Sequence, residues 1–222
     1  MNQEPRIVIA VTGASGSIYA NELLLKCLRN NLRTYLIFTP TAVKVLRTEI
    51  PDSLLSALAS LKQKMRFQDL ESLHPIALKS DLTPLQLEKL KIFDHDDFYA
   101  PVASGSLGAT HMCLIPASMG SIARVAHGMS SNLIERCADV MMKEARPLVV
   151  VPRESPLNSI HLRNLTLLAE SGVRVVPAMP AFYFQPKSIS DLVAFMVERV
   201  IQALGIESLT SQNKLAWNEN RL

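Results

Sequence analysis

Short apolar runs alternate along the chain with longer stretches in which apolar residues recur at helical spacing. The runs predict strands, and they lie at residues 7–11, 33–38, 112–115, 148–151 and 173–176. The helical spacing predicts helices, and it covers residues 18–28, 41–49, 132–145 and 189–204. This alternation predicts an α/β fold with a doubly wound parallel sheet and one ligand crevice at the carboxyl ends of its strands.

The most apolar of these runs is Leu148–Val151, in which three of the four residues are β-branched. Such a run is typical of a parallel strand that is covered on both faces. It ends at Pro152, and Arg153 and Glu154 follow at once. Because ligands of open α/β sheets bind outside the carboxyl ends of strands, this Arg-Glu pair is a candidate for chemistry.

The helix before that strand, at about 132–145, carries a row of charged residues. Their spacing places them on one face, and they are Arg136, Asp139, Lys143 and Arg146. One interpretation is a solvated helix face. The other is that part of this row joins Arg153 in an anion site.

A Gly-rich turn, residues 12–17, follows the first predicted strand and leads into a helix. A strand, turn and helix in this order present backbone N–H groups and a helix N-terminus to an anion such as phosphate. Ser15 and Ser17 add hydroxyl donors. The turn lacks the Gly-Lys-Ser/Thr of a Walker loop and the three glycines of a dinucleotide fingerprint, so it indicates an anion without identifying it.

Composition narrows the class of protein. Hydrophobic residues make up 48% of the 222 residues and charged residues 19%, which is typical of a globular protein. The net charge of +3, without a dense Lys/Arg run, argues against a nucleic-acid partner. No run reaches the roughly 18 apolar residues that span a membrane, and the N-terminal run is too short for a signal peptide. We expect Cys27, Cys113 and Cys137 to be reduced core residues of a cytoplasmic protein.

We expect one domain over residues 1–205, with a helical insertion at about 50–91 and a C-terminal tail at 206–222. In the insertion, Leu54, Leu55, Leu58, Leu61 and Met65 have helical spacing, and Leu82-Thr83-Pro84 opens a helix that runs into Leu85–Lys91.

The acidic run Asp94-His95-Asp96-Asp97 is the one sequence feature that resembles a metal site. Adjacent residues in an extended or turning segment point in different directions, so we expect a polar loop and no metal there. Phe98 and Tyr99 follow it and are candidates for the rim of a planar ligand site.

Several segments together resemble the UbiX-type flavin prenyltransferases. They are TGASGS at 12–17, ASGS at 103–106, NLIER at 132–136, RPLVVVPRESPLN at 146–158 and Phe-Tyr-x-Gln-Pro at 182–186. The resemblance implies a flavodoxin-like, three-layer α/β/α fold, FMN bound between subunits and a homododecamer. It also implies metal-independent transfer of dimethylallyl from dimethylallyl monophosphate to N5 and C6 of reduced FMN. The product, prenylated FMN, would serve a UbiD-type decarboxylase, and ubiquinone biosynthesis is the family's usual setting.

The resemblance also assigns residues. It implies that the flavin contacts Gly13, Ala14, Ser15, Thr39, Ser104, Ser118, Met119 and Arg136. It implies that the prenyl phosphate meets Lys143, Arg153, Glu154, Tyr183 and Arg199, with Glu154, Ser104 and Tyr183 as catalytic groups. These residue types suit the reaction, since Arg and Lys bind a departing phosphate and Glu and Tyr can transfer protons.

Two alternatives stay open on the residues alone. The chain could be a flavin-dependent decarboxylase of the same fold, although Pro116-Ala117-Ser118-Met119-Gly120-Ser121 departs from the PASANT motif of the cysteine decarboxylases. It could also be a non-catalytic flavin-binding subunit, for which Lys143, Glu154 and Arg199 would be unnecessary.

Overall fold

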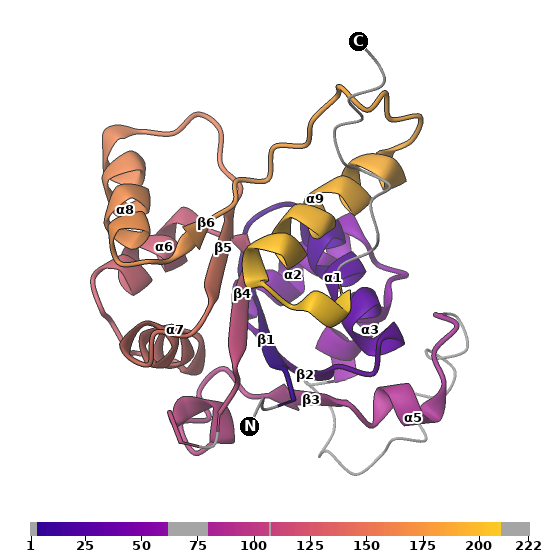
Figure 1. Ribbon diagram of the computed structural model, residues 1–222, viewed down its shortest axis with the longest axis horizontal. Coiled ribbons are helices and arrows are strands. Elements are labelled where there is room, and N and C mark those ends of the chain that lie inside the picture. Colours follow the sequence, from indigo (N-terminus) through magenta and orange to yellow (C-terminus); the bar gives the residue numbers. More distant parts are fainter. Residues whose placement is uncertain (1–3, 62–79, 107, 210–222) are drawn as a thin grey trace.

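The computed structural model describes residues 4–61, 80–106 and 108–209, and its centre is a parallel sheet of six strands (Figure 1). The strand order is β3-β2-β1-β4-β5-β6. The strands are β1 (Arg6–Val11), β2 (Arg33–Phe38), β3 (Leu90–Phe93), β4 (His111–Ala117), β5 (Leu148–Pro152) and β6 (Arg174–Val175). The chain moves outward from β1 through β2 to β3 and then returns to β4 on the other side of β1. The sheet therefore has its switch point between β1 and β4, where α/β proteins bind ligands.

Helices cover both faces of the sheet and confirm the predicted three layers (Figure 1). One face is covered by α1 (Ser17–Arg29), α2 (Pro40–Glu49), α3 (Leu54–Leu61) and α9 (Ile189–Leu204). The other carries α6 (Met119–Ala126) and α7 (Leu133–Lys143), with α8 (Ser159–Glu170) packed on α6. The short helices α5 (Pro84–Leu87), η2 (Pro101–Ala103) and η3 (Glu207–Leu209) complete the described chain.

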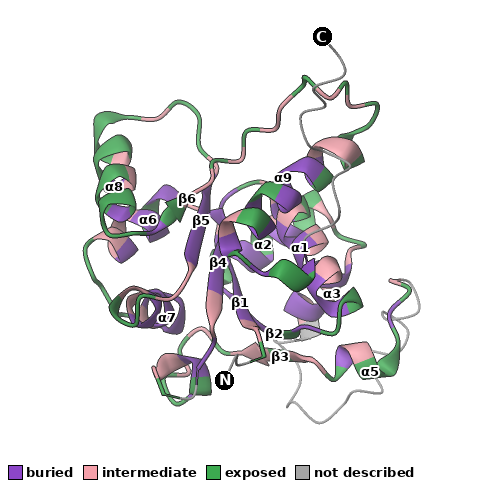
Figure 2. Ribbon diagram, in the orientation of Figure 1, coloured by how far each residue is buried: buried purple, intermediate pink, exposed green. Residues whose placement is uncertain are grey.

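Successive residues of the central strands belong to two different cores. Ile7, Ile9 and Val11 of β1 pack under α1 and α9, whereas Val8 and Ala10 pack under α6 and α7. Side chains of a strand point alternately to its two faces, so a strand buried on both sides has no polar positions. This explains the continuous apolar runs, and Figure 2 shows β1 and β4 buried after their first residues.

Helix boundaries follow from capping residues that are visible in the sequence. Thr39 accepts a hydrogen bond from the Ala42 N–H at the start of α2, and Asn132 caps α7 in the same way. Ser188 and Asp191 form a reciprocal capping box at α9, which ends at Gly205 in the left-handed conformation. The predicted limits of α9 are confirmed to the residue.

Two elements differ from the expectations. The helix predicted up to Lys91 ends at Leu87, and the edge strand β3 begins at Leu90. That strand was missed because an edge strand is only partly buried and Leu90 and Ile92 fit either period. Helix α8 was not singled out, since Asn164 and Leu168 are its only buried residues.

Other expectations on this part of the chain are not tested. The described portion of the insertion at about 50–91 contains α3, α5 and the first residues of β3. Met65 and tail residues 210–222 lie outside the described residues, so the proposed domain division stays a prediction. Among the helices that the structure describes, none is both long and apolar enough to cross a membrane.

Gly13 is required by close packing, because a Cβ atom there would lie 2.5 Å from Thr41 Cγ2 at the start of α2. We expect Gly13→Ala to lower the free energy of unfolding by about 1–3 kcal/mol, the usual cost of overpacking. Thermal unfolding measures this. The matched control is Gly120→Ala, whose Cβ would meet only Arg124 Nη1 at 3.6 Å. Equal stability of the two variants would show that the Thr41 side chain moves aside without lowering the free energy of unfolding.

Candidate active site

Hydrogen bonds tie several predicted site residues together at the carboxyl ends of β1, β2, β4 and β5. The Thr39 N–H donates to the Val11 carbonyl at 3.0 Å, which places Thr39 beside the Gly-rich turn. Arg153 Nε donates to the Ser15 carbonyl at 3.2 Å, and its N–H donates to the Ala117 carbonyl at 3.4 Å. The structure therefore brings together Gly13, Ala14, Ser15, Thr39, Ser118, Met119, Arg153 and Glu154, here called the carboxyl-edge group.

The Gly-rich turn already holds an anion from its own chain. The Glu49 carboxylate, at the end of α2, accepts hydrogen bonds from Gly16 N–H (3.0 Å) and Ser17 N–H (2.9 Å). Partial burial raises the pKa of Glu49, but hydrogen bonds from Ser15, Ser17 and Gly16 outweigh it and hold the pKa below its ordinary value. The turn thus has the anion-binding geometry that the sequence predicts.

Glu49 also limits what that turn can do. A flavin phosphate can take the Gly16 and Ser17 N–H groups only if Glu49 withdraws, because both ligands are anionic. If Glu49 remains in place, its carboxylate stays hydrogen-bonded to Ser15. These two side chains are then an acid–base pair within the carboxyl-edge group. Sequence reasoning missed Glu49 because only the fold brings the end of α2 to the first turn.

The lowered pKa of Glu49 predicts a pH-dependent contribution to stability. The contribution is fully present above the unfolded-state pKa, about 4.3, and is lost as the pH falls through the lower folded-state pKa. Glu49→Gln should therefore lower the melting temperature most at neutral pH, and the difference from the wild type should shrink toward pH 3. Melting curves across this range test it, with Glu207→Gln as an exposed control. A difference that does not change with pH would contradict the prediction.

The first turn of α6 forms another side of the carboxyl-edge group. The Ser118 hydroxyl caps α6 by accepting from Ser121 N–H, and the Ser118 N–H donates to Thr12 Oγ1 at 2.7 Å. The Met119 side chain is only 6% exposed. Helix geometry leaves the N–H groups of Met119 and Gly120 without intrahelical acceptors, so backbone donors are what this turn offers a ligand.

A second set of predicted residues lies on or beside α7. It is here called the α7 group and consists of Ser104, Arg136 and Lys143. Arg136 Nε donates to the Ala103 carbonyl at 3.1 Å, and its Nη1 pairs with Asp139 at 2.8 Å. Lys143 Nζ lies 3.4 Å from a Glu144 carboxylate oxygen. A Cβ on Gly105 would touch that same Glu144, so Ser104 lies next to the end of α7.

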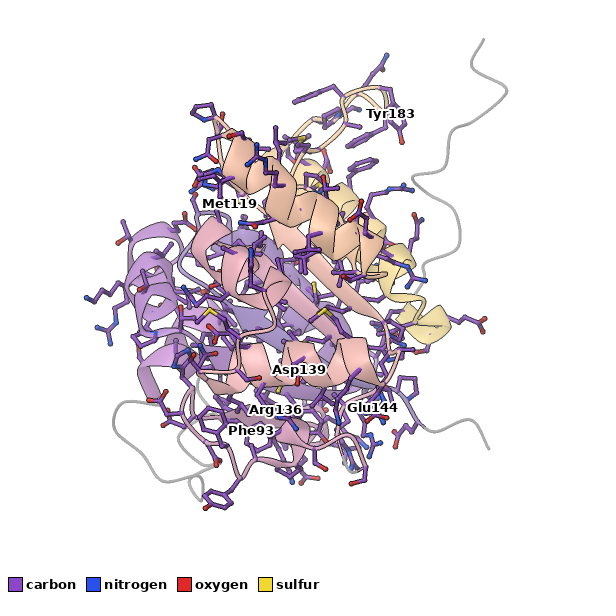
Figure 3. The ribbon with its side chains drawn as sticks, turned by 90° about the vertical axis from the view of Figure 1, so that its left-hand side faces the viewer. Phe93, Met119, Arg136, Asp139, Glu144 and Tyr183 are labelled. Atoms are coloured by element: carbon purple, nitrogen blue, oxygen red, sulfur yellow. The ribbon has the colours of Figure 1, made fainter. Side chains whose placement is uncertain are left out.

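The α7 group does not meet Arg153 within one chain. Helix α7 ends at the amino edge of the sheet, where Arg146 donates to the Ala109 carbonyl before β4 begins. Arg153 follows the opposite end of β5, which has five residues and so is roughly 16 Å long. Figure 3 shows Arg136, Asp139 and Glu144 along α7, well away from Met119. One chain alone therefore does not bring the row and Arg153 together, and an anion site that joins them stays a prediction.

Tyr183 and Arg199 form a third set, the α9 group. The Tyr183 ring packs edge-on against Phe195 of α9, with centroids 6.0 Å apart, and Arg199 is one helical turn further along. Arg199 is exposed and donates to Gln202. Tyr183 lies on the loop at 176–188, which extends from β6 toward the start of α9 (Figures 1 and 3).

Two further expectations concern the segment before β4. Phe98 is 45% exposed and Tyr99 is fully exposed, so within one chain they do not wall a pocket. Within the described ranges no group of three His, Cys, Asp or Glu side chains is placed to hold a metal ion. Asp94–Asp97 instead form a loop whose His95 carbonyl accepts from the Leu133 N–H at 2.8 Å.

Comparison with known proteins identifies the family. The family model described as Flavoprotein matches residues 1–201. A flavin prenyltransferase UbiX of Alkalihalophilus pseudofirmus is 40% identical over 204 residues, which are 92% of this chain and 93% of that protein.

Solved structures of similar proteins point to the same family. A dodecameric FMN-dependent UbiX-like decarboxylase from Escherichia coli O157:H7 superposes with a TM-score of 0.76 at 31% identity, covering 96% of this chain and 99% of its own. The AnUbiX (PadA1) protein, solved with FMN and dimethylallyl pyrophosphate, gives 0.75 at 29% identity, with coverage of 97% and 100%. The carboxyl-edge geometry and these similarities agree, and the chain belongs to the UbiX family of flavin prenyltransferases.

Proposed function

We propose that this protein joins the dimethylallyl group of dimethylallyl monophosphate to N5 and C6 of reduced FMN without a metal. The prenylated FMN would then serve a UbiD-type decarboxylase. The observation that carries this proposal is the placement of Arg153 and Glu154 at the end of β5, tied to the Gly-rich turn through Ser15. Family membership supports the same reaction.

The residues suit the two ligands. The first turn of α6, Thr39 and Ser15 offer hydrogen-bond donors to a flavin, and reduced FMN would supply the nucleophilic atoms when bound. Arg153 would bind the prenyl phosphate and stabilise the negative charge that grows as the C–O bond breaks. Glu154 lies beside it, and its side chain is exposed. It is therefore our candidate for moving a proton at the leaving phosphate. Glu49 with Ser15 is a second candidate base.

We further propose that the complete site is formed between subunits. The α7 group and the α9 group carry cations that suit a phosphate, yet α7 reaches the amino edge of its own sheet. Neighbouring chains can present these groups to the carboxyl edge, with Phe98 and Tyr99 as apolar walls. The dodecameric state of the E. coli neighbour is the model for such an assembly.

The cysteines support a cytoplasmic location as part of this proposal. Cys27, Cys113 and Cys137 are buried free thiols. Burial raises the pKa of Cys27 to about 12 and does the same for Cys137, so these thiols stay protonated and unreactive. Such thiols are typical of a protein from a reducing compartment.

The decisive experiment is anaerobic incubation with reduced FMN and dimethylallyl monophosphate, followed by mass spectrometry of the released flavin. We expect a mass gain of one dimethylallyl unit. Unchanged FMN released from a protein that binds flavin would rule out this donor. Dimethylallyl pyrophosphate and the flavin-dependent decarboxylase activity would then be tested in turn.

A further inference from the structure

An ion pair between a half-exposed arginine and a buried carboxylate joins α6 to α7 behind the carboxyl-edge group, and the proposed chemistry does not use it. Arg124 Nε donates to Glu135 Oε1 at 2.5 Å, and the Ser131 N–H donates to Glu135 Oε2 at 2.8 Å. The Glu135 side chain is 2% exposed. A carboxylate buried to this degree is costly unless it is paired, so the contact fixes both side chains.

Hydrogen bonds continue from this pair to the Gly-rich turn. Arg124 Nη2 donates to Ser121 Oγ at 3.4 Å, and the Ser118 hydroxyl donates to the same oxygen at 3.1 Å. The Ser118 N–H then donates to Thr12 Oγ1 at 2.7 Å, and that hydroxyl donates to the Pro116 carbonyl at 2.8 Å. The chain of contacts thus runs from Glu135 through the first turn of α6 to the residue before Gly13.

The charges of the pair agree with the helices that carry them. Arg124 lies in the last turn of α6 and Glu135 in the first turn of α7, where each charge interacts favourably with its helix dipole. Burial raises the pKa of Glu135, but hydrogen bonds from Arg124 and Ser131 outweigh it, so the carboxyl group is ionised at neutral pH. The ion pair therefore sets the distance between the end of α6 and the start of α7.

We propose that Arg124 and Glu135 are positioning residues for the flavin. By fixing α6 against α7 they determine where the N–H groups of Met119 and Gly120 and the Ser118 cap lie relative to the cofactor. Neither side chain needs to touch the flavin, since small displacements of groups that bind a reactant are enough to weaken binding. The inference rests on the proposed function, because it assumes that FMN binds at the carboxyl-edge group.

The test is the variant Glu135→Gln, which keeps the shape of the side chain and removes its charge. We expect the dissociation constant for FMN, measured by quenching of flavin fluorescence, to rise about tenfold. The absorption spectrum of the bound flavin should shift as well, and Arg124→Lys should recover part of the affinity that Arg124→Gln loses. The double variant Arg124→Gln/Glu135→Gln should lose no more FMN affinity than whichever single variant binds FMN more weakly.

The matched control is Lys26→Met, which breaks a largely buried ion pair between two other helices, Lys26–Glu198 between α1 and α9. Both Lys26→Met and Glu135→Gln should lower the melting temperature, but only Glu135→Gln should change FMN binding. Unchanged FMN affinity in Glu135→Gln, or a loss that follows a change in oligomeric state on gel filtration, would overturn the inference. If Glu135→Gln does not fold, Arg124→Gln decides, since that side chain is 42% exposed. Failure of the wild type to bind FMN would instead overturn the proposed function, and this inference with it.

Discussion

Glu154→Gln should lower the rate of prenyl transfer by about 10²- to 10⁴-fold, the usual contribution of a general acid or base, while FMN stays bound. The side chain is exposed on the loop after β5, where it accepts a hydrogen bond from the N–H of the next residue, Ser155, at 3.1 Å. Removing its charge therefore breaks no packing, and the free energy of unfolding should change by less than about 0.5 kcal/mol. Single-turnover measurement of prenylated flavin, with FMN binding measured in parallel, tests both statements.

The control for this prediction is Glu170→Gln, which removes an exposed carboxylate at the end of α8. It should leave the rate and FMN binding unchanged. Loss of flavin from Glu154→Gln would mean that Glu154 holds the cofactor and that the proton is moved by another group. Glu49 would then be the next candidate, because the structure pairs it with Ser15.

The sequence was sufficient for most of the fold, for a physical reason. Strands buried on both faces must be apolar without interruption, so β1, β4 and β5 were recognisable from short runs. Caps such as Thr39 and Ser188 fixed helix starts. The edge strand β3 and the outer helix α8 were not recognisable, because an element covered on one side or less has a weak pattern.

The candidate site was predictable where its residues directly follow a strand, because the carboxyl ends of parallel strands share one edge of the sheet. The Arg153-Glu154 pair and the turn around Ser15 were found from strand ends, and the structure joins them directly. Glu49 was not found, because its contact with Gly16 depends on how α2 packs beside α1. The row on α7 shows a limit of sequence spacing. Its spacing correctly put the charges on one face, but spacing within a helix says nothing about which end of the sheet the helix reaches.

Two inactive variants should restore activity to each other if the complete site is shared between subunits. Glu154→Gln alters the carboxyl-edge group and Lys143→Met the α7 group, and within one chain these lie at opposite edges of the sheet. In an oligomer assembled at random from equal amounts of both, about a quarter of the sites would pair an intact Glu154 from one chain with an intact Lys143 from another. Co-expressed and co-purified with different tags, the mixture should therefore show about a quarter of wild-type activity, whereas each variant alone is nearly inactive. The control mixes Glu154→Gln with Arg153→Met, which alter the same group of one chain and should not complement. An inactive first mixture that has assembled normally would mean that Lys143 and Glu154 do not come together from different chains.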